Sequence, residues 1–176
     1  IHPLTAASDY HAQLAQGAVD VVIGNWLQPP DDLHQSQLVI DQVVCLVAND
    51  HPAVRRGWTP ESWLESEHVA PTPLHPGARG VIDDHLDSLG LRRRITARCP
   101  HFGLIPAMVA SSLLVLTTSR QFCERYAVKR GEAPEMTLPV RILPCPIPLP
   151  RMSNYQLWHE RTHTSSATRW QRERAT

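Results

Sequence analysis

The sequence of 176 residues lacks three features that would indicate a particular class of protein. Its formal net charge is zero, so bulk electrostatics gives no reason to expect that this segment binds nucleic acid. No apolar run approaches the roughly 20 residues that a membrane-spanning helix needs. The four cysteines are scattered and include no C-x-x-C pair, so neither a zinc ribbon nor a redox pair is indicated. We expect reduced thiols, with Cys45 buried in the apolar run VVCLVA.

What the sequence does contain is typical of a folded protein. Hydrophobic residues make up 42% of the chain and charged residues 19%, which is the composition of an ordinary globular protein. The length fits one domain or two small lobes. The chain starts at Ile1 without a signal peptide, and IHPLT looks like the end of a strand already under way. We therefore expect a fragment of a longer polypeptide.

Short apolar strands and amphipathic helices alternate along the chain. Ser8 or Asp9 is expected to cap a helix that ends at Gly17, and Thr59 is expected to cap a second helix. This alternation predicts parallel sheets with crossover helices. The stretch LPVRILPCPIPLPR (138–151) contains five prolines, which excludes a helix or a central strand and predicts an extended crossing segment.

One string near the end, His159-Glu160-Arg161-Thr162-His163, matches H-E-x-x-H. On a helix this spacing places two imidazoles on one face to bind zinc, with the glutamate as general base. A long helix is not expected here, because Tyr155 and Thr164 favour a strand or an irregular stretch. Only Glu173 could supply a further ligand downstream. We interpret the residues as packing residues near a C-terminal helix and keep a zinc hydrolase as an alternative.

Five stretches carry the pattern of a known family: LAQGAVDVVIGNW, VVCLVANDHPAV, GVIDDHLDSLGLRRRI, CPHFGLIPAMVASSLLVLTTSR and the tail LWHERTH…RW. Their order and spacing resemble the effector-binding domain of LysR-type transcriptional regulators, in the aromatic-responsive and nodulation-type branch. The resemblance covers nearly the whole chain and makes the His-Glu string part of the family tail. The family's amino-terminal winged helix-turn-helix and linker helix, and the first strand-helix unit of lobe one, have no counterpart in this chain.

The resemblance implies an α/β, two-lobe, periplasmic-binding-protein-like (type 2) fold, with parallel-sheet lobes joined by two crossover strands. It places lobe one at residues 1–46 plus 144–176, incomplete at its N-terminus, and lobe two at residues 47–143. It also implies a small-molecule inducer bound between the lobes and DNA bound only through the missing amino-terminal domain. A homo-oligomer, a dimer or tetramer in the full-length protein, and a cytoplasmic location without membrane association follow from the same resemblance.

Ligands of open α/β folds bind beyond the carboxyl ends of the strands, and three loops of this sequence occupy such places. In the first, Asn25 precedes Trp26, whose ring could stack on an aromatic ligand or simply pack at the surface. In the second, Arg79 could clamp a carboxylate and Gly80 starts a helix whose backbone N–H groups attract anions. A solvated surface arginine is the alternative reading of Arg79.

In the third loop, His101 and Phe102 precede a helix and resemble family positions that contact the inducer. His101 could instead be a structural hydrogen-bonding residue, and Phe102 and Ile105 could be core residues. Thr117 ends a strand beside the same expected cleft. The complete set of predicted ligand-binding residues is Asn25, Trp26, Thr72, His75, Arg79, Gly80, His101, Phe102, Ile105 and Thr117.

We do not expect an enzyme. Ser111, Ser112 and Ser119 have no nucleophile-elbow motif around them, and no glycine-rich phosphate loop is present. No cofactor or metal is therefore expected. The solute-binding protein of a transporter shares the two-lobe fold and remains an alternative, which would require an export signal upstream.

Overall fold

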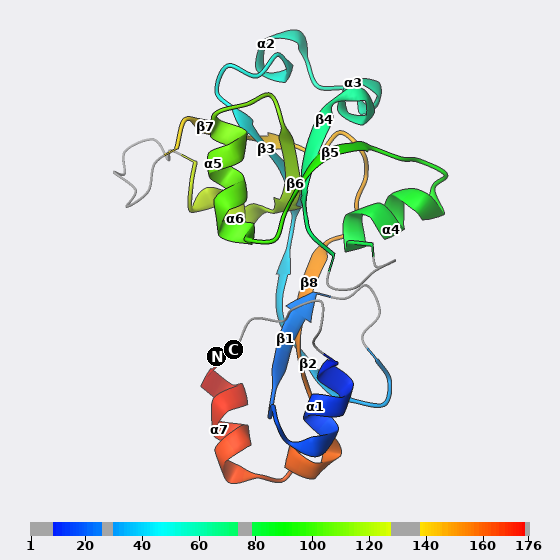
Figure 1. The fold of residues 1–176 in the computed structure, drawn as a ribbon, viewed down its shortest axis with the longest axis vertical. Coiled ribbons are helices and arrows are strands. Elements are labelled where there is room, and N and C mark those ends of the chain that lie inside the picture. Colours follow the sequence, from blue (N-terminus) through cyan, green and yellow to red (C-terminus); the bar gives the residue numbers. More distant parts are fainter. Residues whose placement is uncertain (1–8, 26–29, 74–78, 128–137, 175–176) are drawn as a thin grey trace. The chain divides into compact units, whose positions relative to one another are not determined.

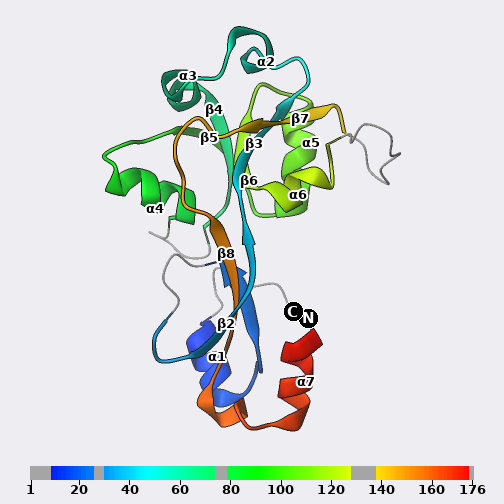
Figure 2. The ribbon, with the colours of Figure 1, turned by 180° about the vertical axis from the view of Figure 1, so that it is seen from behind.

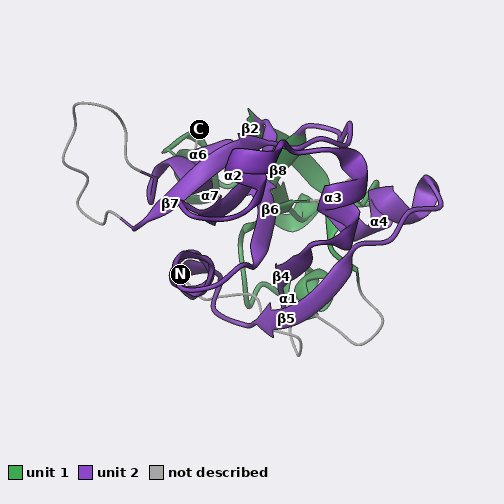
Figure 3. Ribbon diagram, turned by 90° about the horizontal axis from the view of Figure 1, so that it is seen from above, with its two compact units in different colours: residues 1–40, 74–81, 152–176 green, residues 41–73, 82–151 purple. Residues whose placement is uncertain are grey.

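The structure is a computed structural model that describes residues 9–25, 30–73, 79–127 and 138–174. The chain divides into two compact units, coloured separately in Figure 3. Unit 1 comprises residues 1–40, 74–81 and 152–176, and unit 2 comprises residues 41–73 and 82–151. By this division the chain crosses between the units four times, after residues 40, 73, 81 and 151. The lobe boundaries near residues 46 and 144 that the sequence indicated stay a prediction.

Unit 1 contains a three-stranded sheet in the order β1-β8-β2, with β1 antiparallel to β8 (Figure 1). Its elements are α1 (Tyr10–Gln16), β1 (Val22–Asn25), β2 (His34–Asp41), β8 (Met152–Trp158), a 3-10 helix (Glu160–Thr162) and α7 (Ser166–Arg174). Leu14, Val22, Leu33 and Leu157 form its buried core. Unit 1 therefore has a small hydrophobic core of its own.

The helix ends of unit 1 confirm the sequence signals. The Asp9 carboxylate accepts a hydrogen bond from the N–H of Ala12 at 3.0 Å, which caps α1. Gly17 ends the helix with φ of 75°, a left-handed conformation that suits glycine. The guanidinium of Arg161 occupies the space that a side chain at position 17 would need. Only glycine therefore fits there without displacing Arg161.

Unit 2 contains a five-stranded sheet in the order β5-β4-β6-β3-β7. Its strands are β3 (Val43–Ala48), β4 (Glu67–Pro71), β5 (Arg94–Cys99), β6 (Val115–Ser119) and β7 (Val140–Pro144). Its helices are α2 (Ala53–Arg56), α3 (Pro60–Glu65), α4 (Val81–Ser88), a 3-10 helix (Phe102–Leu104), α5 (Ile105–Ala110) and α6 (Arg120–Glu124). The proline-rich β7 is an edge strand, which confirms that it could not be central.

The strand directions of unit 2 are mixed. β4 runs parallel to β5 and to β6, as the alternation of strands and helices predicted. β3 runs antiparallel to β6 and to β7, and Figure 2 shows β7 lying along β3. β3 is the first strand of unit 2 in the sequence and β7 is the last. The expectation of wholly parallel sheets is therefore wrong for β3 and its neighbours. It is also wrong for unit 1, where β1 and β8 are antiparallel.

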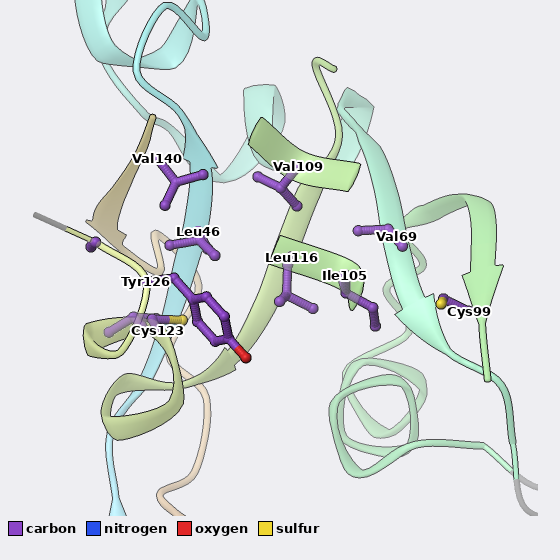
Figure 4. Packing of buried hydrophobic residues seen from close by; sticks show 11 residues of the cluster. Leu46, Val69, Cys99, Ile105, Val109, Leu116, Cys123, Tyr126 and Val140 are labelled. Atoms are coloured by element: carbon purple, nitrogen blue, oxygen red, sulfur yellow. The ribbon is translucent and has the colours of Figure 1, made fainter. Parts of the chain in front are cut away.

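One face of the unit 2 sheet packs against α5 and α6. Leu46, Val69 and Leu116 point from neighbouring strands toward Ile105 and Val109 of α5 (Figure 4). Each of these five side chains is fully buried. Burial of an aliphatic side chain of this size contributes about 1.5–3 kcal/mol, so this face is the main hydrophobic core of unit 2.

The opposite face of the same sheet carries polar side chains. Trp63 of α3 is fully buried, and its indole N–H donates to Sγ of Cys45 at 3.2 Å. Thr59 and Ser62 form the capping box that starts α3, with Pro60 as the first helical residue, as predicted. His68 of β4 donates from Nε2 to the Trp63 carbonyl at 2.7 Å. This second face is therefore held by hydrogen bonds as well as by apolar contacts.

Candidate ligand-binding site

β5, β4 and β6 are neighbouring parallel strands, so their carboxyl ends lie together at one border of the unit 2 sheet. We call this border the carboxyl edge, as distinct from the edge strands β5 and β7. Thr72 directly follows β4, and its N–H donates to the Cys99 carbonyl at the end of β5 at 3.1 Å. Two loops that are far apart in the sequence are thereby joined at their first residues. Ligands of α/β sheets bind at such edges, so we define Thr72, Arg98, His101 and Phe102 as the carboxyl-edge cluster.

His101 and Phe102 reach this edge from the loop after β5. Both side chains are exposed, and the His101 carbonyl accepts hydrogen bonds from the Leu104 N–H at 2.9 Å and the Cys99 thiol at 3.3 Å. The Phe102 ring packs on Phe122 of α6, with ring centroids 4.2 Å apart. The loop is thus fixed by backbone bonds and by one ring contact, while an imidazole and an aromatic face remain at the surface.

Arg98, the one arginine of the carboxyl-edge cluster, was not among the residues predicted from the sequence. Its guanidinium donates to the Pro71 carbonyl at 3.1 Å, and the side chain is exposed beside Thr72. The signal was present in the sequence, since Arg98 is the last arginine of the alternating stretch RRITARC before the predicted loop. An exposed guanidinium at this edge can pair with a carboxylate.

Two predicted residues lie inside unit 2. Ile105 belongs to the hydrophobic core with no exposed surface, as Figure 4 shows. Thr117 is buried in β6, and its hydroxyl lies 3.6 Å from Sγ of Cys45 on the second face of the sheet. Both side chains are buried in this structure, and their contribution to ligand binding stays a prediction.

The remaining predicted residues belong to unit 1. Arg79 and Gly80 are exposed and directly precede α4, as the sequence indicated. Asn25 is exposed at the end of β1. Trp26 and His75 lie outside the described residues. The structure therefore joins Thr72, His101 and Phe102 at one edge and leaves the contribution of the unit 1 residues as a prediction.

The H-E-x-x-H string has a structural role in unit 1. β8 ends at Trp158, His159 caps the following 3-10 helix through the N–H of Arg161, and Glu160 pairs with His34. The Trp158 indole N–H donates to Nδ1 of His163 at 3.2 Å. Across the part of the chain that the structure describes, no group of three or more His, Cys, Asp or Glu could hold a metal ion. The string thus packs the end of β8, as the sequence analysis favoured.

Two compact α/β units, between which the chain passes more than once, are the architecture of periplasmic-binding-protein-like proteins. A family model described as the LysR substrate binding domain matches residues 4–176. The chain belongs to this LysR family.

Individual relatives agree with this assignment. The chain is 26% identical over 167 residues to the HTH-type transcriptional activator NagR of a Ralstonia species, covering 95% of this chain and 52% of the relative. It is also 26% identical to nodulation protein D 2 of Rhizobium tropici, covering 97% and 51%. The chain thus spans about half the length of these curated relatives. The first of these relatives is named a transcriptional activator, and neither name supports a transporter component or a zinc hydrolase.

A solved structure shows the same fold. The crystal structure of a probable transcriptional regulator from Pseudomonas aeruginosa matches the whole chain with a TM-score of 0.80 at 22% identity, and the match covers 56% of that chain. The type 2 periplasmic-binding-protein-like fold expected from the sequence is confirmed. Among the described residues, no helix has the length and hydropathy to cross a membrane.

Proposed function

We propose that this chain is the effector-sensing domain of a LysR-type transcriptional regulator and that it binds a small aromatic or anionic inducer. The observation that carries the proposal is the family match over residues 4–176. The chemistry of the carboxyl-edge cluster supports the kind of ligand, because Arg98 and His101 suit an anion and Phe102 offers an aromatic face. Asn25, Trp26, His75, Arg79 and Gly80 are proposed to complete the site.

The proposed mechanism is a shift in conformational population. An inducer that contacts both units would favour one arrangement of the domain over another by the difference in its affinity for the two. In the full-length protein, a homo-oligomer would transmit this change to winged helix-turn-helix domains, which supply the contacts to DNA. The zero net charge of this segment fits such a division of labour. A cytoplasmic location belongs to the same proposal.

Ligand titration of two single variants tests the site. Benzoate serves as the aromatic anion, with acetate and benzyl alcohol separating the contributions of charge and ring. His101→Ala and Arg79→Ala are each expected to raise the Kd for the responding compound about ten-fold, which corresponds to about 1.4 kcal/mol. Isothermal titration calorimetry measures the affinity, and circular dichroism checks that the fold is retained.

The matched control is Arg169→Ala, which removes an exposed arginine of α7 from unit 1. It is expected to leave the Kd unchanged, since Arg169 is not one of the proposed site residues. If His101→Ala and Arg79→Ala bind the ligand as tightly as the parent does, the assigned site is wrong.

A further inference from the structure

Two cysteines that are far apart in the sequence meet on the second face of the unit 2 sheet. β3 and β7 are antiparallel, and Cys45 lies opposite Leu143 in their register. Cys145 is two residues beyond Leu143 and directly follows the end of β7. Residues two apart on a strand share a face, so Cys145 is the diagonal neighbour of Cys45 across the strand pair.

The surroundings of the two thiols differ. Cys45 has no exposed surface, and its Sγ lies 3.2 Å from the Trp63 indole nitrogen and 3.6 Å from the Thr117 hydroxyl. The two thiols also influence each other, since each is among the causes of the other's pKa shift. Cys145 is partly exposed. Cys145 is therefore accessible from solvent, whereas Cys45 is buried and held by its contacts with Trp63 and Thr117.

The electrostatics of the pair assign different roles to the two sulfurs. The neighbouring Cys45 thiol lowers the pKa of the Cys145 thiol, and the Ile147 N–H and the Arg93 guanidinium lower it further, whereas partial burial opposes them. Burial raises the pKa of Cys45. Arg93 is fixed in place, since its buried guanidinium pairs with Asp83 at 2.7 Å. Because Cys145 is also the more exposed of the two, exposure and electrostatics both favour it as the first thiol to react.

We propose that Cys45 and Cys145 form a redox-active dithiol that closes to an intramolecular disulfide when the protein meets a hydroperoxide. The Cys145 thiolate attacks the outer oxygen of the hydroperoxide, the O–O bond breaks, and an alkoxide or hydroxide leaves and takes up a proton. Cys145 is then a sulfenic acid. The Cys45 sulfur attacks the Cys145 sulfur, the S–O bond breaks, and the Cys45 proton leaves with the hydroxyl group as water. Two electrons pass from the two thiols to the peroxide.

The backbone around Cys145 suits this closure. A disulfide requires Cα atoms about 4.4–6.8 Å apart, which is somewhat shorter than the usual diagonal spacing of a strand pair. Cys145 lies beyond the last residue of β7 and stands between Pro144 and Pro146, which have no N–H to donate to a ladder. Cys145 is therefore not among the paired residues of the β3–β7 ladder, and a disulfide at this position requires no ladder pair to break.

The position of the pair gives the disulfide a consequence. Cys45 lies shortly after the chain passes from unit 1 into unit 2 at Ile40–Asp41. Cys145 lies shortly before the chain leaves unit 2 at Arg151–Met152. A covalent bond between them would tie together the incoming and the outgoing segment of unit 2. This inference stands on the β3–β7 register and the thiol contacts, independently of the proposed function.

Hydrogen peroxide titration of the purified protein, followed by peptide mass spectrometry, tests the proposal. The expected product is one disulfide-linked peptide pair that contains Cys45 and Cys145, with the loss of two thiols per chain. Cys45→Ala is expected to leave a sulfenic acid at Cys145, which dimedone traps. Cys145→Ser changes a partly exposed residue and is expected to retain all the remaining thiols in the same titration.

Cys123 provides the matched comparison. It is fully buried, and burial raises its pKa to about 12. Cys145 is expected to be modified at least about ten-fold faster than Cys123, since reactivity follows thiolate character and exposure. Cys123→Ser is expected to form the 45–145 disulfide as the parent does. Over-oxidation of Cys145 without a disulfide, or a Cys145 bond between two copies of the chain, would overturn the proposal.

Discussion

Each unit contains a tryptophan–histidine pair, and the two pairs behave as opposites. In unit 2, the rings of Trp63 and His68 meet edge to face, with centroids 4.7 Å apart and planes at 70°. In unit 1, the rings of Trp158 and His163 are nearly parallel at 8°, with centroids 6.2 Å apart. In unit 2 both residues of the pair are therefore buried, whereas in unit 1 a buried tryptophan stacks on an exposed histidine.

Burial fixes the protonation of the unit 2 pair. His68 has no exposed surface, and its desolvation lowers its pKa to about 4 despite the hydrogen bond to the Trp63 carbonyl. Because Nε2 donates to that carbonyl, the proton sits on Nε2 and Nδ1 is an acceptor. Nδ1 has no hydrogen-bond partner in the structure. His68 is therefore a neutral residue held by geometry.

Charge surrounds the unit 1 pair instead. The Arg172 guanidinium lies over the Trp158 ring at 4.4 Å, and the His34 ring stacks on His163 at 4.0 Å. Glu160 pairs with His34, and this contact holds the pKa of the Glu160 carboxyl below its usual range. The two pairs also differ in the acceptor of the indole N–H. This acceptor is the buried Cys45 sulfur in unit 2 and an exposed imidazole in unit 1.

Among the tests of this contrast, Trp63→Ala is expected to have the largest effect on stability. It removes a fully buried indole, the contact with His68 and the bond to Cys45. We expect the free energy of unfolding to fall by about 3–5 kcal/mol, measured by urea denaturation. Trp170→Ala, at a tryptophan that is 57% exposed, is the control and is expected to change it by less than about 0.5 kcal/mol. Equal losses would show that Trp63 is not a core anchor.

The pH dependence of stability gives a second test. The folded pKa of His68, about 4, lies below the ordinary value of 6.5, so the unfolded chain binds this proton more readily. The contribution of His68 is therefore complete above about pH 6.5 and is lost as the pH falls toward 4. Between pH 7.5 and pH 5, we expect a loss of about 2 kcal/mol.

His68→Gln identifies the source of this pH dependence. Glutamine can still donate to the Trp63 carbonyl and cannot be protonated in this range. Urea denaturation of the variant is expected to show about 2 kcal/mol less change between pH 7.5 and pH 5 than the parent shows. An unchanged pH profile would assign the effect to other groups.

The smallest effect is expected for Arg172→Lys in unit 1. Arg172 is buried, and its guanidinium donates to the carbonyls of Thr162 at 3.4 Å and His163 at 3.1 Å while covering Trp158. Lysine keeps the charge but loses the planar fork, so we expect a loss of about 1–2 kcal/mol in thermal or urea unfolding. Arg169→Lys, on the exposed face of α7, is the control. A loss as large as that of Trp63→Ala would erase the contrast between the two units.

The local elements of the fold could be predicted because their signals lie within a few residues. The Asp9 and Thr59 caps and the Gly17 stop each depend on neighbours in the sequence. The direction of β3 could not be predicted in this way, because its antiparallel neighbours β6 and β7 come from much later in the chain. The meeting of Cys45 and Cys145 depends on that same register.

The candidate site divides along similar lines. Thr72 and His101 follow strands, so the edge that they share follows from the rule for parallel sheets. For Thr117, the sequence could not tell which face of the sheet the side chain takes, because successive residues of a strand alternate. The stretch RRITARC placed Arg98 near the predicted loop, but its contact with the Pro71 carbonyl of a neighbouring strand could not be read from the sequence.

The contact between Gly17 and Arg161 has a consequence for how this domain can change over time. Gly17 leaves the space that the Arg161 guanidinium fills, so a larger residue at 17 would displace Arg161 and also strain a left-handed backbone. A residue with a short side chain at 161 would relieve only the first of these two obstacles. We expect related sequences that lose the glycine to shorten or lengthen the end of α1 as well. The main obstacle to a single replacement at position 17 is therefore the left-handed backbone, because the flexible end of the Arg161 side chain can move aside.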